Sequence, residues 1–245
     1  MGSGQAIGPW RVLDAREALP LHDRAATRAV EAEAQAGLPA HTLMQRAGLG
    51  VARLAMAVAP HARRVQVLAG PGNNGGDGLV AAWHLWQRGL DVQVCLLANP
   101  ERLPDDAADA WRRARAAGVP IGPAWSDEQR PDLVIDALLG IGATRAPADA
   151  MADLIQRLDR RQVPVLAVDG PTGLDADTGV AALPCVRATW TLSLLTLKTG
   201  LFTASGRDHA GEVWFDDLQV PSREAGACAW LGAGAVAPAG GPGPR

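Results

Sequence analysis

Short apolar runs alternate along this chain with segments that have the spacing of amphipathic helices, and this alternation limits the possible folds most strongly. The apolar runs are residues 65–69, 91–97, 133–138, 163–168, 188–195 and 212–215. Helical patterns of ten or more residues fill intervals between them, at residues 79–88, 105–117 and 149–160. Strands that alternate with helices in this way predict βαβ units and a mostly parallel sheet covered on both faces. We therefore expect an α/β fold with three layers.

The chain is predicted to form one domain. Two helical segments between residues 15 and 57, separated by Gly37 to Pro39, precede the alternating region and are expected to form an N-terminal arm. With 245 residues, 48% of them hydrophobic, the chain can bury a sizeable core. The expected boundaries are a flexible lead at residues 1–13, the domain at 14–224, and a Gly/Pro/Ala-rich tail or linker at 225–245.

The composition argues against several classes of partner. The formal net charge of −3 gives no basic surface of the kind that binds nucleic acid or a membrane. We also expect neither a transmembrane helix nor a secretory signal. Three widely spaced cysteines, Cys95, Cys185 and Cys228, form no metal-binding or disulfide pattern, which is typical of a cytoplasmic protein.

Four predicted strands end in glycine-rich or polar segments instead of ordinary turns. These segments are residues 70–78 (GPGNNGGDG), 136–147 (DALLGIGATRAP), 169–179 (DGPTGLDADTG) and 196–201 (TLKTGL). In open α/β sheets, ligands bind beyond the carboxyl ends of the strands. The four segments are therefore expected to meet at one edge of the sheet and form one site.

The first of these segments is predicted to be a phosphate-binding loop. Five glycines in nine residues leave backbone amides accessible, and the positive end of a helix that starts near Leu79 suits pyrophosphate. The loop has neither the GxGxxG spacing of a dinucleotide fingerprint nor the lysine of a P-loop. The alternative interpretation is a tight turn between a strand and a helix.

Three charged residues at the other strand ends are candidate functional residues. Asp136 follows an apolar strand, where a buried carboxylate needs a partner or a cation, although it could simply cap a turn. Asp169 stands in the same position after the next strand, with the same alternative. Lys198, the sole lysine of the chain, could pair with phosphate or with Asp169. The oxygens of Asn74, Asp136 and Thr172 would suit a hard cation.

The order and spacing of GPGNNGGDG, DALLGIG, VDGPTGLDADTG and TLKTGL resemble the NAD(P)H-hydrate epimerase family, also called the YjeF N-terminal domain. The resemblance covers roughly residues 14 to 220 and includes LMQRAG, which is similar to that family's LMExAG. Three positions depart from the family pattern. Thr172 stands where Ser is more usual, Ile141 where Thr is common, and Gln45-Arg46 where Glu-Asn is usual.

This resemblance implies a Rossmann-like αβα sandwich and an isomerase that interconverts the R and S forms of NADHX or NADPHX at C6 of the hydrated nicotinamide ring. It implies a potassium ion held by Asn74, Asp136 and Thr172, and Asp169 at the reacting end of the substrate. The remaining implied ligand contacts are Asn73, Asn74, Gly75, Gly76 and Asp77, with Gly140, Ile141, Gly142, Ala143, Thr144, Arg145 and Ala146 at the phosphates.

For the chemistry, we expect the ring nitrogen to expel the C6 hydroxyl and water to return from the other face. A carboxylate with a raised pKa could handle both protons, and Asp169 with Lys198 beside it is the candidate. The expected functional partner is an NAD(P)HX dehydratase, and the helical arm could form a homodimer.

Two other functions are considered. The same pocket could belong to a non-catalytic nucleotide-binding module of a regulatory complex. A small-molecule kinase or phosphatase is disfavoured, because neither a P-loop lysine nor a metal-carboxylate cluster follows the glycine loop.

Overall fold

The apolar runs form an eight-stranded sheet with the order β1-β10-β8-β7-β6-β3-β4-β5. The computed structural model describes residues 8–125, 130–143, 145–221, 224 and 226–232. Neighbouring strands run parallel except for β1, which is antiparallel to β10. The strands are β1 (Trp10–Arg11), β3 (Arg64–Ala69), β4 (Asp91–Leu96), β5 (Ile121–Gly122), β6 (Leu133–Ala137), β7 (Val165–Val168), β8 (Trp190–Leu194) and β10 (Glu212–Asp216).

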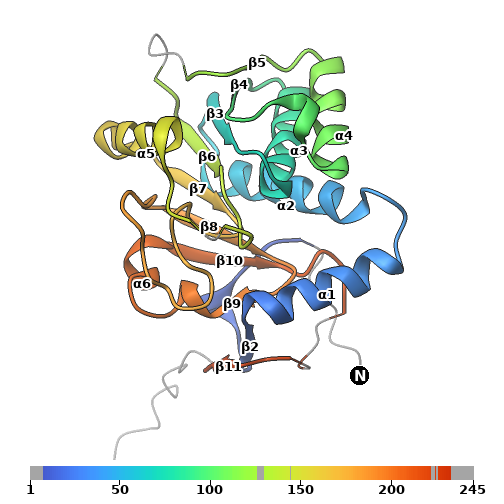
Figure 1. Ribbon diagram of the computed structural model, residues 1–245, viewed down its shortest axis with the longest axis vertical. Coiled ribbons are helices and arrows are strands. Elements are labelled where there is room, and N and C mark those ends of the chain that lie inside the picture. Colours follow the sequence, from blue (N-terminus) through green and yellow to red (C-terminus); the bar gives the residue numbers. More distant parts are fainter. Residues whose placement is uncertain (1–7, 126–129, 144, 222–223, 225, 233–245) are drawn as a thin grey trace, which may run out of the picture.

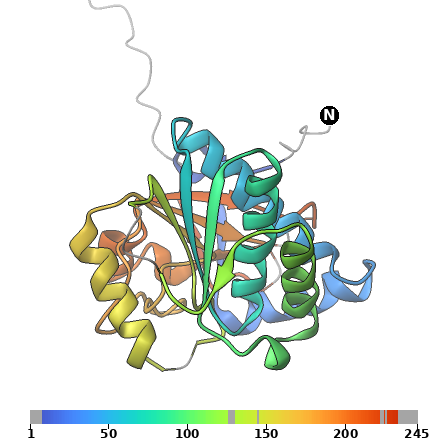
Figure 2. The same ribbon diagram turned by 90° about the horizontal axis from the view of Figure 1, so that it is seen from above.

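Helices cover both faces of this sheet, as Figures 1 and 2 show. Helices α2 (Thr42–Val58), α3 (Asn73–Gln87) and α4 (Asp105–Ala116) lie on one side, and α5 (Asp149–Arg161) lies on the other. Because alternate residues of a strand point to opposite faces, Val67 and Ile135 pack toward α2, α3 and α4, whereas Leu68 and Val134 pack toward α5. The predicted α/β sandwich with three layers is confirmed.

A second, three-stranded sheet lies beside the first and has the order β11-β2-β9. It consists of β2 (Leu19–His22), β9 (Leu197–Lys198) and β11 (Ala229–Leu231), and α1 (Arg24–Ala36) follows β2 directly. The helical pattern expected from residue 15 onward is therefore interrupted by a strand. Leu21 and Leu197 are paired neighbours that are buried in one small core, so tertiary packing decides the conformation of this short segment.

The ordered domain extends past both expected boundaries. In the lead, β1 pairs with β10 and is followed by the 3₁₀ turn η1 (Val12–Asp14). In the tail, β11 pairs with β2. The other short elements are η2 (Pro100–Arg102), η3 (Thr199–Leu201) and α6 (Gly206–His209). Among the described residues, none of the helices is long and apolar enough to cross a membrane.

Candidate functional site

Two adjoining pockets lie at the carboxyl edge of the main sheet. The arm pocket, a cavity of about 490 Å³, is bounded by α1, the starts of α3 and α4, residues 138–143, Asp169 and Lys198. The turn pocket, of about 410 Å³, is bounded by Arg24, Lys198, and residues from segments 139–143, 145–146 and 169–182. Both pockets share Asp169 and Lys198, so this pair lies where they meet.

The structure brings most of the predicted site residues to these pockets. The residues that line one or both are Asn73, Asn74, Asp77, Gly140, Ile141, Gly142, Ala143, Arg145, Ala146, Asp169 and Lys198. Asp136 and Thr172 are fully buried at the same edge of the sheet and pair with each other. Thr144 lies outside the described residues. The convergence of four strand ends on one site, which the sequence predicted, is therefore observed.

The glycine segment differs from its prediction, because α3 starts at Asn73 rather than near Leu79. Three of its glycines lie where the structure is closely packed. A Cβ atom on Gly75 would lie 2.1 Å from the carbonyl oxygen of Gly70, and one on Gly78 would lie 2.6 Å from Cβ of Ala137. A Cβ atom on Gly76 would lie 2.5 Å from the sulfur of Met44. Gly75 and Gly76 are therefore buried where the pocket wall is closely packed, and their contact with the ligand stays a prediction.

Asp169 is held in a defined position at the end of β7. Its φ of +66° lies in the left-handed region that few residues other than glycine adopt, and Asp and Asn tolerate it best. Its backbone N–H donates to the Leu192 carbonyl at 2.7 Å, and its Oδ1 accepts from the Leu194 N–H at 3.1 Å. These contacts turn the carboxyl group toward the junction of the two pockets.

Lys198 forms an ion pair with Asp169 through Nζ and Oδ1. Nζ also donates to the Leu194 carbonyl at 2.6 Å, and only 1% of the lysine side chain is exposed. Of the two partners that the sequence left open, the structure selects Asp169. Because a buried ammonium is costly without a compensating charge, the pair holds both groups in place.

Asp136 and Thr172 form a second buried pair. The Thr172 hydroxyl donates to Oδ1 of Asp136 at 2.7 Å, and the Thr172 N–H donates to Oδ2 at 2.8 Å. Burial raises the pKa of Asp136 to about 6, and the hydrogen bonds from Thr172 and Leu138 lower it by less. Every recorded donor to this carboxylate in the described part of the chain is uncharged.

Asn74 lies on the wall of the arm pocket. It lies against Gly140, where a Cβ atom would be 3.1 Å from Cβ of Asn74. Its side-chain nitrogen is buried without a hydrogen-bond partner in the described structure. A buried N–H group without a partner in the described structure has room for a ligand atom that accepts a hydrogen bond.

Helix α1 contributes residues to the site that the sequence did not identify. Thr27, Arg28 and Glu31 lie on its face toward the arm pocket. The guanidinium of Arg28 reaches the turn at Gly142, to within 3.7 Å of the position of a Cβ there. Thr27 anchors the helix through a 2.8 Å hydrogen bond to the Thr196 hydroxyl. Charged residues along an amphipathic helix normally indicate a solvated face, so the sequence carried no signal for this role.

Asp77, on the second turn of α3, lies among other acidic groups of the arm pocket. Burial raises its pKa well above the ordinary value, and so do the charges of Asp169, Glu31 and Asp106, whereas Lys198 lowers it by less. Burial likewise raises the pKa of Glu31. This wall of the pocket therefore favours protonated carboxyl groups or a bound cation.

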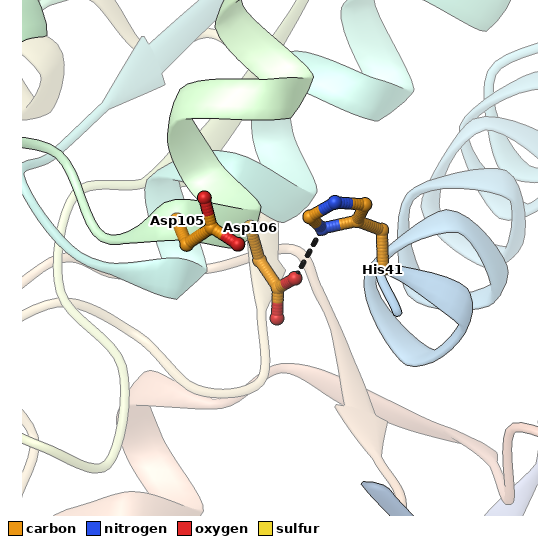
Figure 3. A group of neighbouring side chains, drawn as sticks. All are labelled: His41, Asp105 and Asp106. Carbon is orange, nitrogen blue, oxygen red and sulfur yellow. Dashed lines mark hydrogen bonds and ion pairs between the residues drawn. The ribbon is translucent and has the colours of Figure 1, made fainter. Parts of the chain in front are cut away.

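A contact between two helices involves Asp106, which lines the arm pocket. Figure 3 shows His41, at the start of α2, reaching Asp106 at the start of α4 with a distance of 2.5 Å from Nδ1 to Oδ1. The ligand atoms of these two residues and Asp105 lie within 4.8 Å of one another. Two ligands on one metal ion would stand about 3 Å apart, so the shorter distance indicates a hydrogen bond that ties α2 to α4.

Comparisons with known proteins agree with this architecture. The family model described as YjeF-related protein N-terminus matches residues 40–200. A protein of Bordetella pertussis named NAD(P)H-hydrate epimerase is 45% identical over 183 residues, which is 72% of this chain and 78% of that protein. The Bifunctional NAD(P)H-hydrate repair enzyme Nnr of Escherichia coli is 36% identical over 193 residues, 78% of this chain and 37% of that protein.

Among solved structures, the crystal structure of the yeast protein YNL200c matches with a TM-score of 0.68 and 24% sequence identity. The match covers 80% of this chain and 87% of the yeast chain. At that identity, the likeness establishes the shared fold.

Proposed function

The chain belongs to the family of YjeF-related protein N-termini and is an NAD(P)H-hydrate epimerase, and we propose that Asp169 and Lys198 carry its reaction at the junction of the two pockets. The enzyme is an isomerase that interconverts the R and S forms of NADHX and NADPHX. The observation that carries the residue assignment is the buried Lys198–Asp169 ion pair, which lines both pockets.

The chemistry requires proton handling at C6 and no redox partner. The substrate carries a hydroxyl group on C6, next to the ring nitrogen. The lone pair of that nitrogen expels the hydroxyl group, which leaves as water once protonated, and the ring becomes an iminium cation. A second water adds to the opposite face of C6 and loses a proton, which restores the neutral ring with inverted configuration.

In this proposal Asp169 exchanges a proton with the C6 oxygen, and Lys198 positions it. The Lys198 ammonium and the Leu194 N–H both hold Oδ1, which leaves Oδ2 free of recorded protein contacts in the described residues. A carboxylate with one oxygen fixed and the other directed at substrate is suited to general acid–base catalysis. Its negative charge also stabilises the iminium cation.

The test of this function is direct conversion. Purified protein is mixed with (R)-NADHX, and formation of the S form is followed with a dehydratase that accepts only the S form. Conversion well above the spontaneous rate is expected. A protein that bound the nucleotide without accelerating conversion would be a binding module, and the proposal would be rejected.

The phosphates of the substrate are proposed to lie between residues 140–146 and the start of α3. The N-terminus of a 15-residue helix favours phosphate, because its first N–H groups are free and its dipole is positive there. Arg28 supplies a positive charge at the same turn.

Replacing Arg28 by glutamine is therefore expected to raise KM about tenfold and to leave kcat unchanged, which corresponds to about 1.4 kcal/mol of binding free energy. The matched control is Arg112→Gln on the exposed side of α4, which should change neither constant. Equal KM values for Arg28→Gln and the parent would remove Arg28 from the binding site.

A potassium ion is proposed to bind Asn74, Asp136 and Thr172. The donor set fits, because the buried Asp136 carboxylate is held only by uncharged donors in the described structure, and the side chains of Asn74 and Thr172 add neutral oxygens. Bound there, the ion would supply a positive charge that compensates Asp136 and fixes the loops that follow β6 and β7.

Replacing choline chloride with potassium chloride at equal ionic strength should raise the free energy of unfolding. The gain is about 2.7 kcal/mol at an ion concentration of about 100 times Kd. Thr172→Val should abolish the potassium-dependent part of the gain, whereas Thr191→Val, at a buried threonine in β8, should retain it. Thermal melts measured in both salts provide the comparison. Equal gains in the two variants would contradict this ion site.

We also propose a functional partnership with an NAD(P)HX dehydratase. The bifunctional relative in Escherichia coli supports this partnership. The cysteines Cys95, Cys185 and Cys228 are free thiols, which supports a reducing compartment such as the cytoplasm. A homodimer through the N-terminal arm also remains part of the proposal.

A further inference from the structure

Among the described residues, Asp77 is the acidic group of the arm pocket whose carboxyl group has no partner. Glu31 lies beside Arg28 on α1, Asp106 accepts a hydrogen bond from His41, and Asp169 pairs with Lys198. Within the described residues, no hydrogen bond or ion pair is recorded for the carboxyl group of Asp77, although the residue lines the pocket. Its oxygens are therefore available to a ligand.

Asp77 and Asp169 approach the arm pocket from different layers of the fold. Asp77 projects from α3, in the helical layer, and Asp169 follows β7 in the sheet. Both residues line the arm pocket, and the charge of Asp169 raises the pKa of Asp77. A ring bound between them would have one carboxyl group on each side.

Epimerisation makes different demands on the two sides of such a ring. One oxygen must gain a proton in order to leave as water, and the oxygen that arrives on the opposite face must lose one. A single carboxyl group that performed both steps would have to reach both faces. Two groups in different charge states, one on each wall, avoid this requirement.

We propose that Asp77 is a second catalytic residue, a neutral acid that protonates the departing C6 hydroxyl while the Asp169 carboxylate accepts a proton from the incoming water. This inference rests on the proposed function and divides between two residues the task that the sequence assigned to one. The surroundings match this division of roles, because the Lys198 ammonium compensates the negative charge of Asp169, whereas no ion pair joins Asp77 to a cation in the described part of the chain.

The Asp77 carboxyl proton moves to the C6 oxygen, the C6–O bond breaks, and the nitrogen lone pair forms a C=N bond. Water then forms a new C6–O bond from the other side, and its proton moves to Asp169. Asp77 ends as a carboxylate and Asp169 as an acid, and proton exchange with solvent restores the first state. The reverse reaction runs from the other protonation state.

The charged groups that face Asp77 favour its neutral form. They are Glu31 on α1, Asp106 on α4, and Asp169, with Lys198 acting in the opposite sense. Burial and the three carboxylates raise the pKa of Asp77 well above that of an ordinary aspartate. Since the acid form is the active one in this proposal, kcat should fall as the pH rises through this pKa.

The experiment compares Asp77→Asn with the parent protein and with Asp153→Asn, a control on the exposed face of α5. Asparagine has the shape of the neutral acid and has no transferable acid proton. We expect kcat for (R)-NADHX to fall about 10²-fold with KM little changed, and the alkaline decline of kcat to disappear. Binding of NADP⁺, measured by calorimetry, should stay equal to the parent and report an intact pocket.

Three results would overturn the inference. The first is a higher KM with kcat retained, which would make Asp77 a binding residue only. The second is an Asp77→Asn variant that is as active as an active parent protein. The third is a parent whose kcat does not decline at high pH, and this measurement does not depend on whether the variant folds. A parent with no epimerase activity would instead reject the proposed function itself.

Discussion

Asp169→Asn is expected to lower kcat for the interconversion of R and S forms by about 10³-fold, the largest effect on activity of any variant considered. The substitution removes the carboxylate that accepts the proton and leaves the geometry almost unchanged. Asparagine tolerates the left-handed backbone at this position, and its oxygen can still accept from the Leu194 N–H and from Lys198.

The rate is measured with the S-specific dehydratase in excess, and the spontaneous conversion is subtracted. Asp153→Asn should behave as the parent. Lys198→Met provides a second readout: it leaves the carboxylate in place without its ammonium partner, so its pH profile should change as well as its rate. A parent-like rate of Asp169→Asn would show that the proton is handled elsewhere.

The location of the site could be predicted from the sequence, because ligands of open α/β sheets bind beyond the carboxyl ends of the strands. A parallel sheet brings the carboxyl ends of its strands to one edge, so Asp136 and Asp169, at the neighbouring strands β6 and β7, lie at the same edge, and Lys198 meets Asp169 there from β9 of the second sheet. The sequence pattern could not predict which charged groups form ion pairs. Whether Lys198 pairs with phosphate or with Asp169 depends on side-chain distances, and the structure gives Asp169.

The missed features share a cause, because tertiary contacts outweighed the local signal. Arg28 and Glu31 occupy positions that look solvated on an amphipathic helix, and only the placement of α1 over the pocket gives them a role. The strand β11 has three residues in an Ala- and Gly-rich tail and exists because β2 offers it a partner. The glycines at the start of α3 have low helix propensity, yet close packing favours them there.

Gly75→Ala tests that last explanation and is expected to destabilise the fold by about 3 kcal/mol, at the upper end of overpacking effects. On helix propensity alone, alanine should stabilise this position by up to about 1 kcal/mol, so the two explanations predict opposite signs. The new methyl group would lie 2.1 Å from the Gly70 carbonyl oxygen, a backbone atom that no change of rotamer can move. Denaturant titration of the purified variant gives the change in free energy of unfolding.

Gly72→Ala is the matched control from the same motif, because a Cβ on Gly72 would have no neighbour within 4 Å. Gly72 is the residue before α3, where glycine is only slightly preferred over alanine. The Gly72→Ala substitution should therefore lower the free energy of unfolding by less than about 1 kcal/mol. Equal stabilities of Gly75→Ala and Gly72→Ala would mean that the glycines are there for the ligand. A large difference means that they bring α3 close to the strand ends, and so place Asn74 and Asp77 on the wall of the pocket.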